Sequence, residues 1–371
     1  MNVKIPEVKE FHLVMCVILL MSTGLIFLAS AAHPHIEYWL SWQSLWIKQC
    51  VYWCMGIVLI YLVSLIPLQF WNRCAPLGIL MSLMLLIMVL LPGIGTSVKG
   101  SARWIRLPFM NIQVTELVKL SVVVFMASYL SKHHRMLAYH AATFYKPLLV
   151  VAVLAMCILA QPDLGSVVVI VTVTMVMMFL SGAPLKYFFA LSGFAFASLA
   201  ALAFTQPYRI ERIKAFLAPW QHKTHEGYQI VNAFMAIGHG GLWGVGLGQS
   251  IQKQFYLPEA HTDFLFAVMT EEGGLIVALA FLMLFAFMIL LILQTARRAQ
   301  YRDDHFGYLL CVGIGFWLAI QGLINVAVNL GLLPTKGITL PLISYGGSSL
   351  LISCVALGMV FRTIKEHHEY R

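Results

Sequence analysis

The stretch LPEAHTDFLFAVMTEEGG (257–274) has acidic side chains at the start of an apolar run and again further inside it. Asp263 stands where the run begins, and a carboxylate at the boundary of water and lipid can accept a proton from a substrate hydroxyl. Asp is also a favoured helix N-cap, so both interpretations of Asp263 stay open on these residues alone. Glu271 and Glu272 are adjacent and point in different directions. We expect at least one of them to face the protein interior, where it has either a raised pKa or a cationic partner.

Two other apolar stretches contain ionisable side chains, which are costly in a membrane and are usually paired or functional. Glu116 and Lys119 are spaced i, i+3, so they lie on one face of a helix and are expected to form a structural ion pair. Asp163 lies in AQPDLGS (160–166), directly before a new apolar run. This position suits an N-cap and suits a site residue equally well.

The composition shows which elements must position these residues. Of 371 residues, 60% are hydrophobic and 11% are charged, whereas a soluble domain has about 25% charged residues. The apolar runs last about 20 residues, as needed for helices that cross a bilayer. We therefore predict an all-α, polytopic membrane bundle of about ten transmembrane helices, forming one domain over residues 1–371. The predicted spans are 11–32, 47–68, 75–92, 112–131, 146–161, 164–182, 185–205, 264–294, 307–330 and 346–363.

The cations predict the orientation of this bundle. Lys and Arg concentrate in the tails and in the loops on the same side, so the positive-inside rule places both termini in the cytoplasm. The loop 93–111 is an exception on the opposite, external side. Its cations either bind an anion such as a lipid phosphate or extend to lipid headgroups, and charge alone leaves both readings open. These cations are Lys99, Arg103 and Arg106.

One long external loop, about 206–262, separates seven spans from three. It opens with QPYRIERIKAFLAPW (206–220), which includes Arg209 and Arg212 and predicts a short amphipathic helix on the membrane. GHGGLWGVGLGQS (238–250) lacks a nucleotide-binding fingerprint and predicts a turn where two backbones approach closely. The net charge of +9 does not gather in a patch with interleaved aromatics, so nucleic acid is not an expected partner.

Five motifs occur in order along the chain: KGSARWI (99–105), AQPDLGS (160–166), PYRIERI (207–213), LPEAHTDFLFAV (257–268) and LPTKGITLPLISYGGSSL (333–350). Together they resemble the SEDS family, the shape, elongation, division and sporulation proteins. The last motif and the run 207–220 are most similar to the division members of that family. Val114 and Thr115 depart from the family, which usually has Pro-Ser before the Glu.

The resemblance implies a peptidoglycan glycosyltransferase that polymerises lipid II at the outer face of the bacterial plasma (inner) membrane. A class B penicillin-binding protein is the implied transpeptidase partner, and other divisome membrane proteins are implied at the division septum. The essential aspartate of the family matches Asp263, which becomes the expected general base. Converting an α-linked donor into a β-linked glycan is an inversion, for which one carboxylate base suffices.

The leaving pyrophosphate would be stabilised by cations or by a divalent metal such as Mg²⁺ or Mn²⁺. The sequence establishes no cofactor and leaves any metal ligands unknown. The supporting structural residues are expected to be Glu116, Lys119, Asp163, Glu271 and Glu272. The expected substrate contacts are Lys99, Arg103, Arg106, Arg209, Arg212 and Lys336.

Two other functions compete with this one. Ten spans with internal charges also suit a flippase or transporter of a lipid-linked sugar, although the chain lacks the matched broken helices typical of an inverted-repeat carrier. The charged motifs also gather on the external face and not at the midplane. A non-catalytic scaffold for a penicillin-binding protein is the other alternative.

Overall fold

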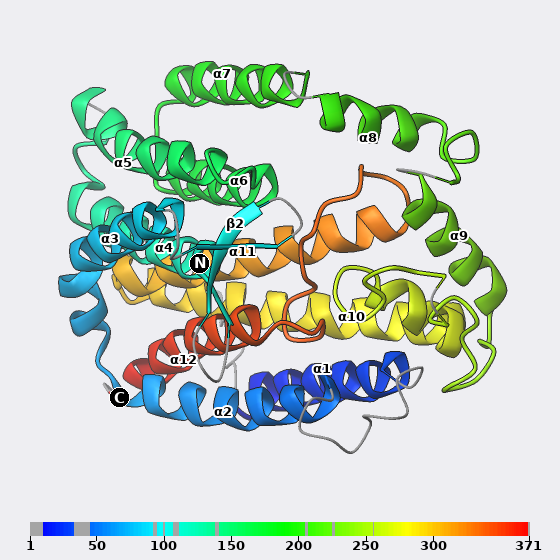
Figure 1. Cartoon of the computed structure of the whole chain (residues 1–371). Helices are drawn as coiled ribbons and strands as arrows, with labels where there is room; N and C mark the ends of the chain where they lie inside the picture. Colours follow the sequence, from blue (N-terminus) through cyan, green and yellow to red (C-terminus); the bar gives the residue numbers. More distant parts are fainter. Residues whose placement is uncertain are drawn as a thin grey trace.

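The computed structural model describes residues 10–32, 45–91, 95–98, 101–106, 111–137, 141–204, 207–224, 227–254 and 256–369. Helices dominate this part of the chain (Figure 1). The helices are α1 (Glu10–Ala31), α2 (Leu45–Leu65), α3 (Leu68–Leu90), α4 (Val114–His133), α5 (Ala141–Leu159), α6 (Leu164–Leu180), α7 (Leu185–Phe204), α8 (Pro207–Leu217), α9 (Tyr228–Gly240), α10 (Leu265–Tyr301), α11 (His305–Asn329) and α12 (Gly347–Glu369). The strands are β1 (Gly95–Val98), β2 (Ser101–Arg106) and β3 (Asn111–Gln113).

The predicted all-α membrane bundle of about ten spans is confirmed. Among the described residues, eight helices are long and apolar enough to cross a membrane. The apolar helix α6 is shorter, with 17 residues, and α7 lies at the remaining predicted span. The helices α4, α11 and α12 are the most enclosed. α11 packs against α4, α6, α10 and α12, so it lies at the centre of the bundle (Figure 1).

A small antiparallel sheet, β1-β2-β3, lies between α3 and α4, where the sequence predicted a loop between two spans. Trp104 is in register with Gln113, and Arg106 with Asn111. The sheet is joined to the start of α12, because Ser348 Oγ donates to the Asn111 carbonyl at 2.7 Å and accepts from the Gln113 backbone N–H at 3.0 Å. β3 runs directly into α4, so the sheet fixes where that helix begins.

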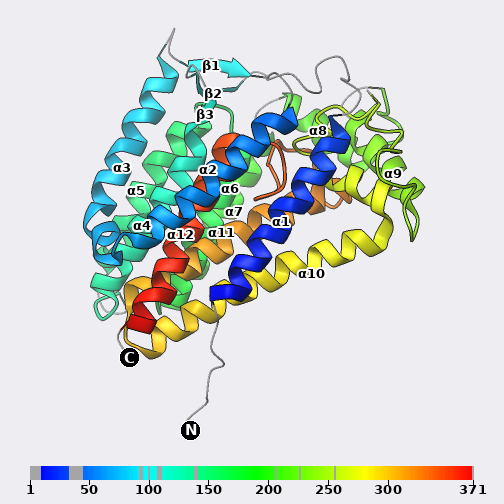
Figure 2. The ribbon, with the colours of Figure 1, turned by 90° about the horizontal axis from the view of Figure 1, so that it is seen from below.

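The sheet, α8, α9 and the segment 330–346 lie together at one end of the bundle, which we call the strand end (Figure 2). The C-terminal end of α12 lies at the other end (Figure 2). The predicted helix within 206–220 is present as α8. Although α4 begins at Val114 without the family's Pro-Ser, Thr115 does not cap it. The N-cap position is Gln113, whose side chain makes no capping bond.

The helix α10 is interrupted at Gly274, whose φ of 71° and ψ of −176° are not helical. The glycine-rich loop fits into this interruption. Its Val245 and Gly246 N–H groups donate to the carbonyls of Glu271 and Glu272, each at 3.0 Å. A Cβ added to Gly244 would lie 2.2 Å from the Glu272 carbonyl oxygen, so the close backbone approach predicted for 238–250 is confirmed.

Candidate functional site

Asp263 is held by two asparagines of α11. It is not the N-cap of α10, because that helix begins at Leu265 and Phe264 occupies the cap position. The Nδ2 groups of Asn325 and Asn329 each donate to the Asp263 carbonyl at 2.9 Å. These two hydrogen bonds fix the backbone that carries the carboxylate, while the residue as a whole stays partly exposed.

Asn329 also binds the beginning of α10. Its Oδ1 accepts from the Ala267 N–H at 3.1 Å, and this N–H also donates to the Phe264 carbonyl at 3.0 Å. Asn325 also donates to the Ile338 carbonyl at 2.7 Å. The sequence analysis missed both asparagines. Their detectable signal was the i, i+4 spacing of two amides on one face of an apolar span.

The motif containing Asp263 also contacts the segment 330–346. Ser344 Oγ donates to the Thr262 carbonyl, and the Tyr345 N–H donates to the His261 carbonyl at 3.0 Å. Burial raises the pKa of the Tyr345 phenol to about 12, with a further contribution from Tyr52. This phenol therefore stays protonated at neutral pH. The Asp263 segment is enclosed between α11 and the last loop of the chain.

Glu116 and Lys119 form the ion pair that their spacing predicts. The Lys119 Nζ lies 2.7 Å from Glu116 Oε1, and both side chains are buried. The same ammonium donates to Gln321 Oε1 at 2.7 Å and lies 5.8 Å from the centre of the Trp317 ring. Gln321 in turn donates to the Thr339 carbonyl at 3.2 Å.

Gln321, Asn325 and Asn329 are spaced four residues apart on α11 and form what we call the polar ladder. At one end the ladder contacts Lys119, and at the other end it contacts Asp263. Between these ends it binds two carbonyls of the segment 330–346. The ladder thus connects the buried ion pair to the candidate catalytic residue through hydrogen bonds and the backbone of residues 338–339.

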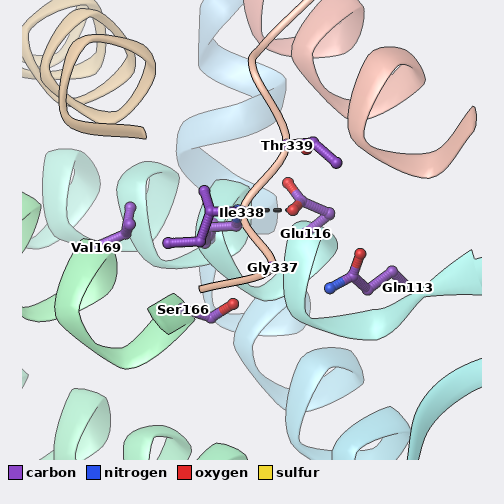
Figure 3. A pocket seen from close by; sticks show the side chains of 8 residues that line it. Gln113, Glu116, Ser166, Val169, Gly337, Ile338 and Thr339 are labelled. Atoms are coloured by element: carbon purple, nitrogen blue, oxygen red, sulfur yellow. Dashed lines mark hydrogen bonds and ion pairs between the residues drawn. The ribbon is translucent and has the colours of Figure 1, made fainter. Parts of the chain in front are cut away.

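A small cavity lies beside the ion pair, between α4, α6 and the segment 337–339 (Figure 3). It is small and partly open, with room for about one water molecule. Glu116 Oε2 accepts no hydrogen bond from any described residue. The cavity is lined by Gln113, Glu116, Lys119, Ser166, Val169, Gly337, Ile338 and Thr339.

Asp163 is the N-cap of α6, which is one of the two roles predicted for it. Its carboxylate accepts from the Ser166 N–H at 3.1 Å and from Ser166 Oγ at 2.8 Å. The cap therefore holds a residue that lines the cavity.

The predicted cationic residues are partly brought together. Arg212 of α8 donates to the Thr335 carbonyl at 3.3 Å, which places it next to Lys336 in the chain. Arg106 ends β2 and is exposed. Lys99 lies outside the described residues, as do the side chains of Arg103 and Arg209. The structure thus joins α8 to the segment 330–346, both at the strand end.

Glu271 and Glu272 are both buried, so the expectation that at least one faces the interior is confirmed. Lys253 Nζ lies 2.8 Å from Glu272 Oε1, and Ser30 Oγ of α1 donates to the same oxygen at 2.7 Å. Glu271 accepts from Ser250 Oγ and from the Ile251 N–H. These bonds attach the long loop and α1 to α10.

Within the described ranges, no three His, Cys, Asp or Glu side chains gather as metal ligands. A Mg²⁺ ion that arrives with substrate phosphates needs only one or two protein carboxylates. The described residues therefore leave room for a cation held jointly with substrate, and they contain no all-protein metal site.

The fold and this site define a polytopic membrane protein with a carboxylate and cations at one end of a helical bundle. Residues 11–369 match the family described as cell cycle proteins, FtsW, RodA and SpoVE. The chain belongs to this family.

Curated relatives have similar sequences over most of the chain. It is 41% identical over 355 residues to a protein of Coxiella burnetii named "Probable peptidoglycan glycosyltransferase FtsW", covering 95% of each chain. It is 45% identical to a protein of the same name from Escherichia coli O6:H1, covering 84% of this chain and 75% of that one.

Solved structures have the same fold. A chain from a peptidoglycan synthase complex that coordinates polymerization and crosslinking aligns with a TM-score of 0.79 at 26% identity, covering 97% of this chain and 98% of that one. The rod shape determining protein RodA of Thermus thermophilus aligns with a TM-score of 0.70 at 26% identity, covering 96% and 97%.

Proposed function

We propose that the protein is a peptidoglycan glycosyltransferase that polymerises lipid II into glycan strands, with Asp263 as the general base. The observation that carries the proposal is the double hydrogen bond from Asn325 and Asn329 to the Asp263 carbonyl. This arrangement fixes the backbone of Asp263, a partly exposed residue at the strand end of a membrane bundle. The family and the names of its relatives support the same activity.

The reaction needs one base and stabilisation of a leaving group. The Asp263 carboxylate removes the proton from the 4-hydroxyl of the acceptor lipid II as that oxygen attacks C1 of the growing chain. The C1–O bond to pyrophosphate breaks at the same time. Attack from the face opposite to the leaving group inverts C1, so no covalent enzyme intermediate is needed.

In this proposal, cations of the strand end stabilise the negative charge that develops on the leaving pyrophosphate. Arg to phosphate bonds are strong and often bidentate. The support from the described geometry is the bond from Arg212 to the Thr335 carbonyl, beside Lys336, and the exposure of Arg106. The full proposed set is Lys99, Arg103, Arg106, Arg209, Arg212 and Lys336.

The proposed setting is the bacterial inner membrane at the division septum, with the strand end outside and both termini in the cytoplasm. The proposed partners are a class B penicillin-binding protein and other divisome membrane proteins. The alignment with a chain of a complex that both polymerises and crosslinks supports a transpeptidase partner. The orientation is supported by the Lys and Arg of the tails and same-side loops.

The experiment is glycan polymerisation by the purified protein with its partner transpeptidase, given lipid II and read as glycan length on a gel. Wild-type protein is expected to produce long strands, and Asp263→Asn is expected to produce none while its elution and thermal unfolding stay unchanged. Asp304→Asn is the matched control, because Asp304 caps α11 at the other end of the bundle. Substantial polymerisation by Asp263→Asn would refute the base assignment. Lipid II transport without polymerisation by the wild type would favour a flippase.

A further inference from the structure

The helix α2 contributes no residue to the catalytic assignment, yet it packs along α12, which begins directly after the segment 330–346 (Figure 1). We propose that Tyr52 of α2 is a positioning residue for the reaction. Its ring fixes the start of α12 and, through it, the backbone next to Asp263. This inference rests on the proposed function, because it takes Asp263 to be the base. Tyr52 itself touches no reacting atom in this proposal.

The first support is the close contact between Tyr52 and Gly347, the first residue of α12. A Cβ added to Gly347 would lie 2.7 Å from both Cε2 and Cζ of the Tyr52 ring. Carbon atoms in contact prefer about 3.5–4.0 Å, so the ring lies directly against the backbone and leaves no space for a side chain. The rigid ring therefore limits how far the start of α12 can move toward α2.

The second support is the connection from the start of α12 to Asp263. Ser344 Oγ donates to the Thr262 carbonyl. The Tyr345 N–H donates to the His261 carbonyl at 3.0 Å, and the centres of these two side-chain rings are 6.0 Å apart in an edge-on arrangement. His261 and Thr262 are the two residues directly before Asp263. A shift at the start of α12 would therefore be passed to the backbone of the base.

The ring of Tyr52 makes a firmer contact with this region than its polar neighbour Gln49, which lies one turn earlier on α2. Gln49 Nε2 donates to the Ser344 carbonyl at 3.4 Å, which is long for a hydrogen bond. Its Oε1 has no hydrogen-bond partner among the described residues. The hold of α2 on the segment next to Asp263 thus depends on the Tyr52 ring more than on the Gln49 amide.

The same two helices meet equally closely further along α12, which supplies a matched control. A Cβ added to Gly358 would lie 2.7 Å from the Cβ of Val63 on α2. Gly358 lies about 16 Å along the helix from Gly347, and neither glycine has a positive φ. Alanine at either position therefore creates a similar overlap between the same helices, and only the overlap at Gly347 adjoins the segment that contacts the Asp263 motif.

The test measures kcat and KM for lipid II in the polymerisation assay with the partner transpeptidase. Hydrogen–deuterium exchange of the amides in 257–268 and 344–350 is measured on the same proteins. Tyr52→Leu removes the ring, and we expect kcat to fall about 10-fold with little change in KM, since a 1 Å misplacement can cost about 100-fold in rate. The amides of both segments are expected to exchange faster. Tyr52→Phe keeps the ring and is expected to behave as the wild type.

The glycine variants test whether the contact itself is responsible. Gly347→Ala pushes against the Tyr52 ring and is expected to lower kcat in the same way. Adding Tyr52→Leu removes the overlap, so the double variant is expected to be no slower than Tyr52→Leu alone. Gly358→Ala is expected to lower the unfolding temperature as Gly347→Ala does, with kcat and the exchange of 257–268 unchanged.

Wild-type kcat in Tyr52→Leu, or equal losses of kcat in Gly347→Ala and Gly358→Ala, would overturn the inference. A loss in Tyr52→Phe as large as in Tyr52→Leu would overturn it too, because the hydroxyl and not the ring would then matter. If Gly347→Ala fails to fold, the two Tyr52 variants still decide. Failure of the proposed function would look different, because the wild type would then make no glycan. In that case faster exchange of 257–268 in Tyr52→Leu would support the positioning role, and unchanged exchange would overturn it.

Discussion

The pair Glu116–Lys119 and the pair Glu272–Lys253 are both buried, with N–O distances of 2.7 and 2.8 Å. The first joins two residues of one helix and borders a cavity at the strand end. The second joins a loop to α10, and Ser30 of α1 binds the same Glu272 oxygen. Nearly identical contacts thus serve different purposes. The polar ladder links the first pair to Asp263, whereas the second pair attaches three distant segments to one another.

Removing the ammonium of the second pair is expected to have the largest effect on stability. Lys253→Met leaves Glu272 buried without its cation. Breaking a buried pair in this way costs about 3–5 kcal/mol. We expect a lower thermal unfolding temperature in detergent, together with loss of polymerisation. The double variant Lys253→Met, Glu272→Gln is expected to recover much of the stability. An unchanged unfolding temperature for Lys253→Met would contradict the claim that the second pair stabilises the fold.

Exchanging the charges of the first pair separates its two roles. Glu116→Lys and Lys119→Glu alone are each expected to cost about 3–5 kcal/mol, because each leaves two like charges buried together. The double exchange is expected to restore part of the stability, since the attraction returns. It is not expected to restore polymerisation, because the carboxylate then lies at position 119 and no longer where Glu116 borders the cavity. Full recovery of both quantities would show that this pair is structural only.

The polar ladder is the feature that distinguishes the first pair, and Asn329→Ala tests it. This change removes one of the two hydrogen bonds that hold the Asp263 carbonyl and one of the two acceptors of the Ala267 N–H, at an expected cost of about 0.5–1.5 kcal/mol for each bond. We expect kcat of polymerisation to fall while KM for lipid II changes little. Asn232→Ala is the matched control, because that buried asparagine donates within its own helix, to the Tyr228 carbonyl at 2.9 Å. Equal kcat values for the two variants would contradict a positioning role.

The smallest expected effect is that of Ser30→Ala, which removes a hydroxyl bound to both members of the second pair and leaves their charges in place. The Ser30 hydroxyl donates to Glu272 and accepts from Lys253 at 2.8 Å. Its loss is expected to cost about 0.5–1.5 kcal/mol, seen as a slightly lower unfolding temperature with lipid II binding unchanged. Weaker lipid II binding at unchanged stability would show that the second pair also serves the substrate.

The features that could be predicted from the sequence depend on short-range spacing. The lengths of the apolar runs predicted the ten spans, because the thickness of a bilayer fixes the length of a crossing helix. The i, i+3 spacing predicted the Glu116–Lys119 pair, and the position of Asp163 before an apolar run predicted a helix cap. The pair and the cap depend on atoms within one turn of a helix, and each span depends only on its own continuous run of residues, so no contact between distant segments is needed to derive them.

Only the tertiary structure determines which groups contact Asp263 and Glu272 and which residues line the cavity. Ser30 and Glu272 are 242 residues apart, and Asn329 and Asp263 are 66 apart. No periodicity relates positions so distant, because their contact depends on how whole helices pack. The sheet β1-β2-β3 was missed for a related reason: its third strand has three residues, too few for an alternating pattern to be recognised. The sequence therefore determined which side chains lie in the membrane bundle, and packing determined which of them meet.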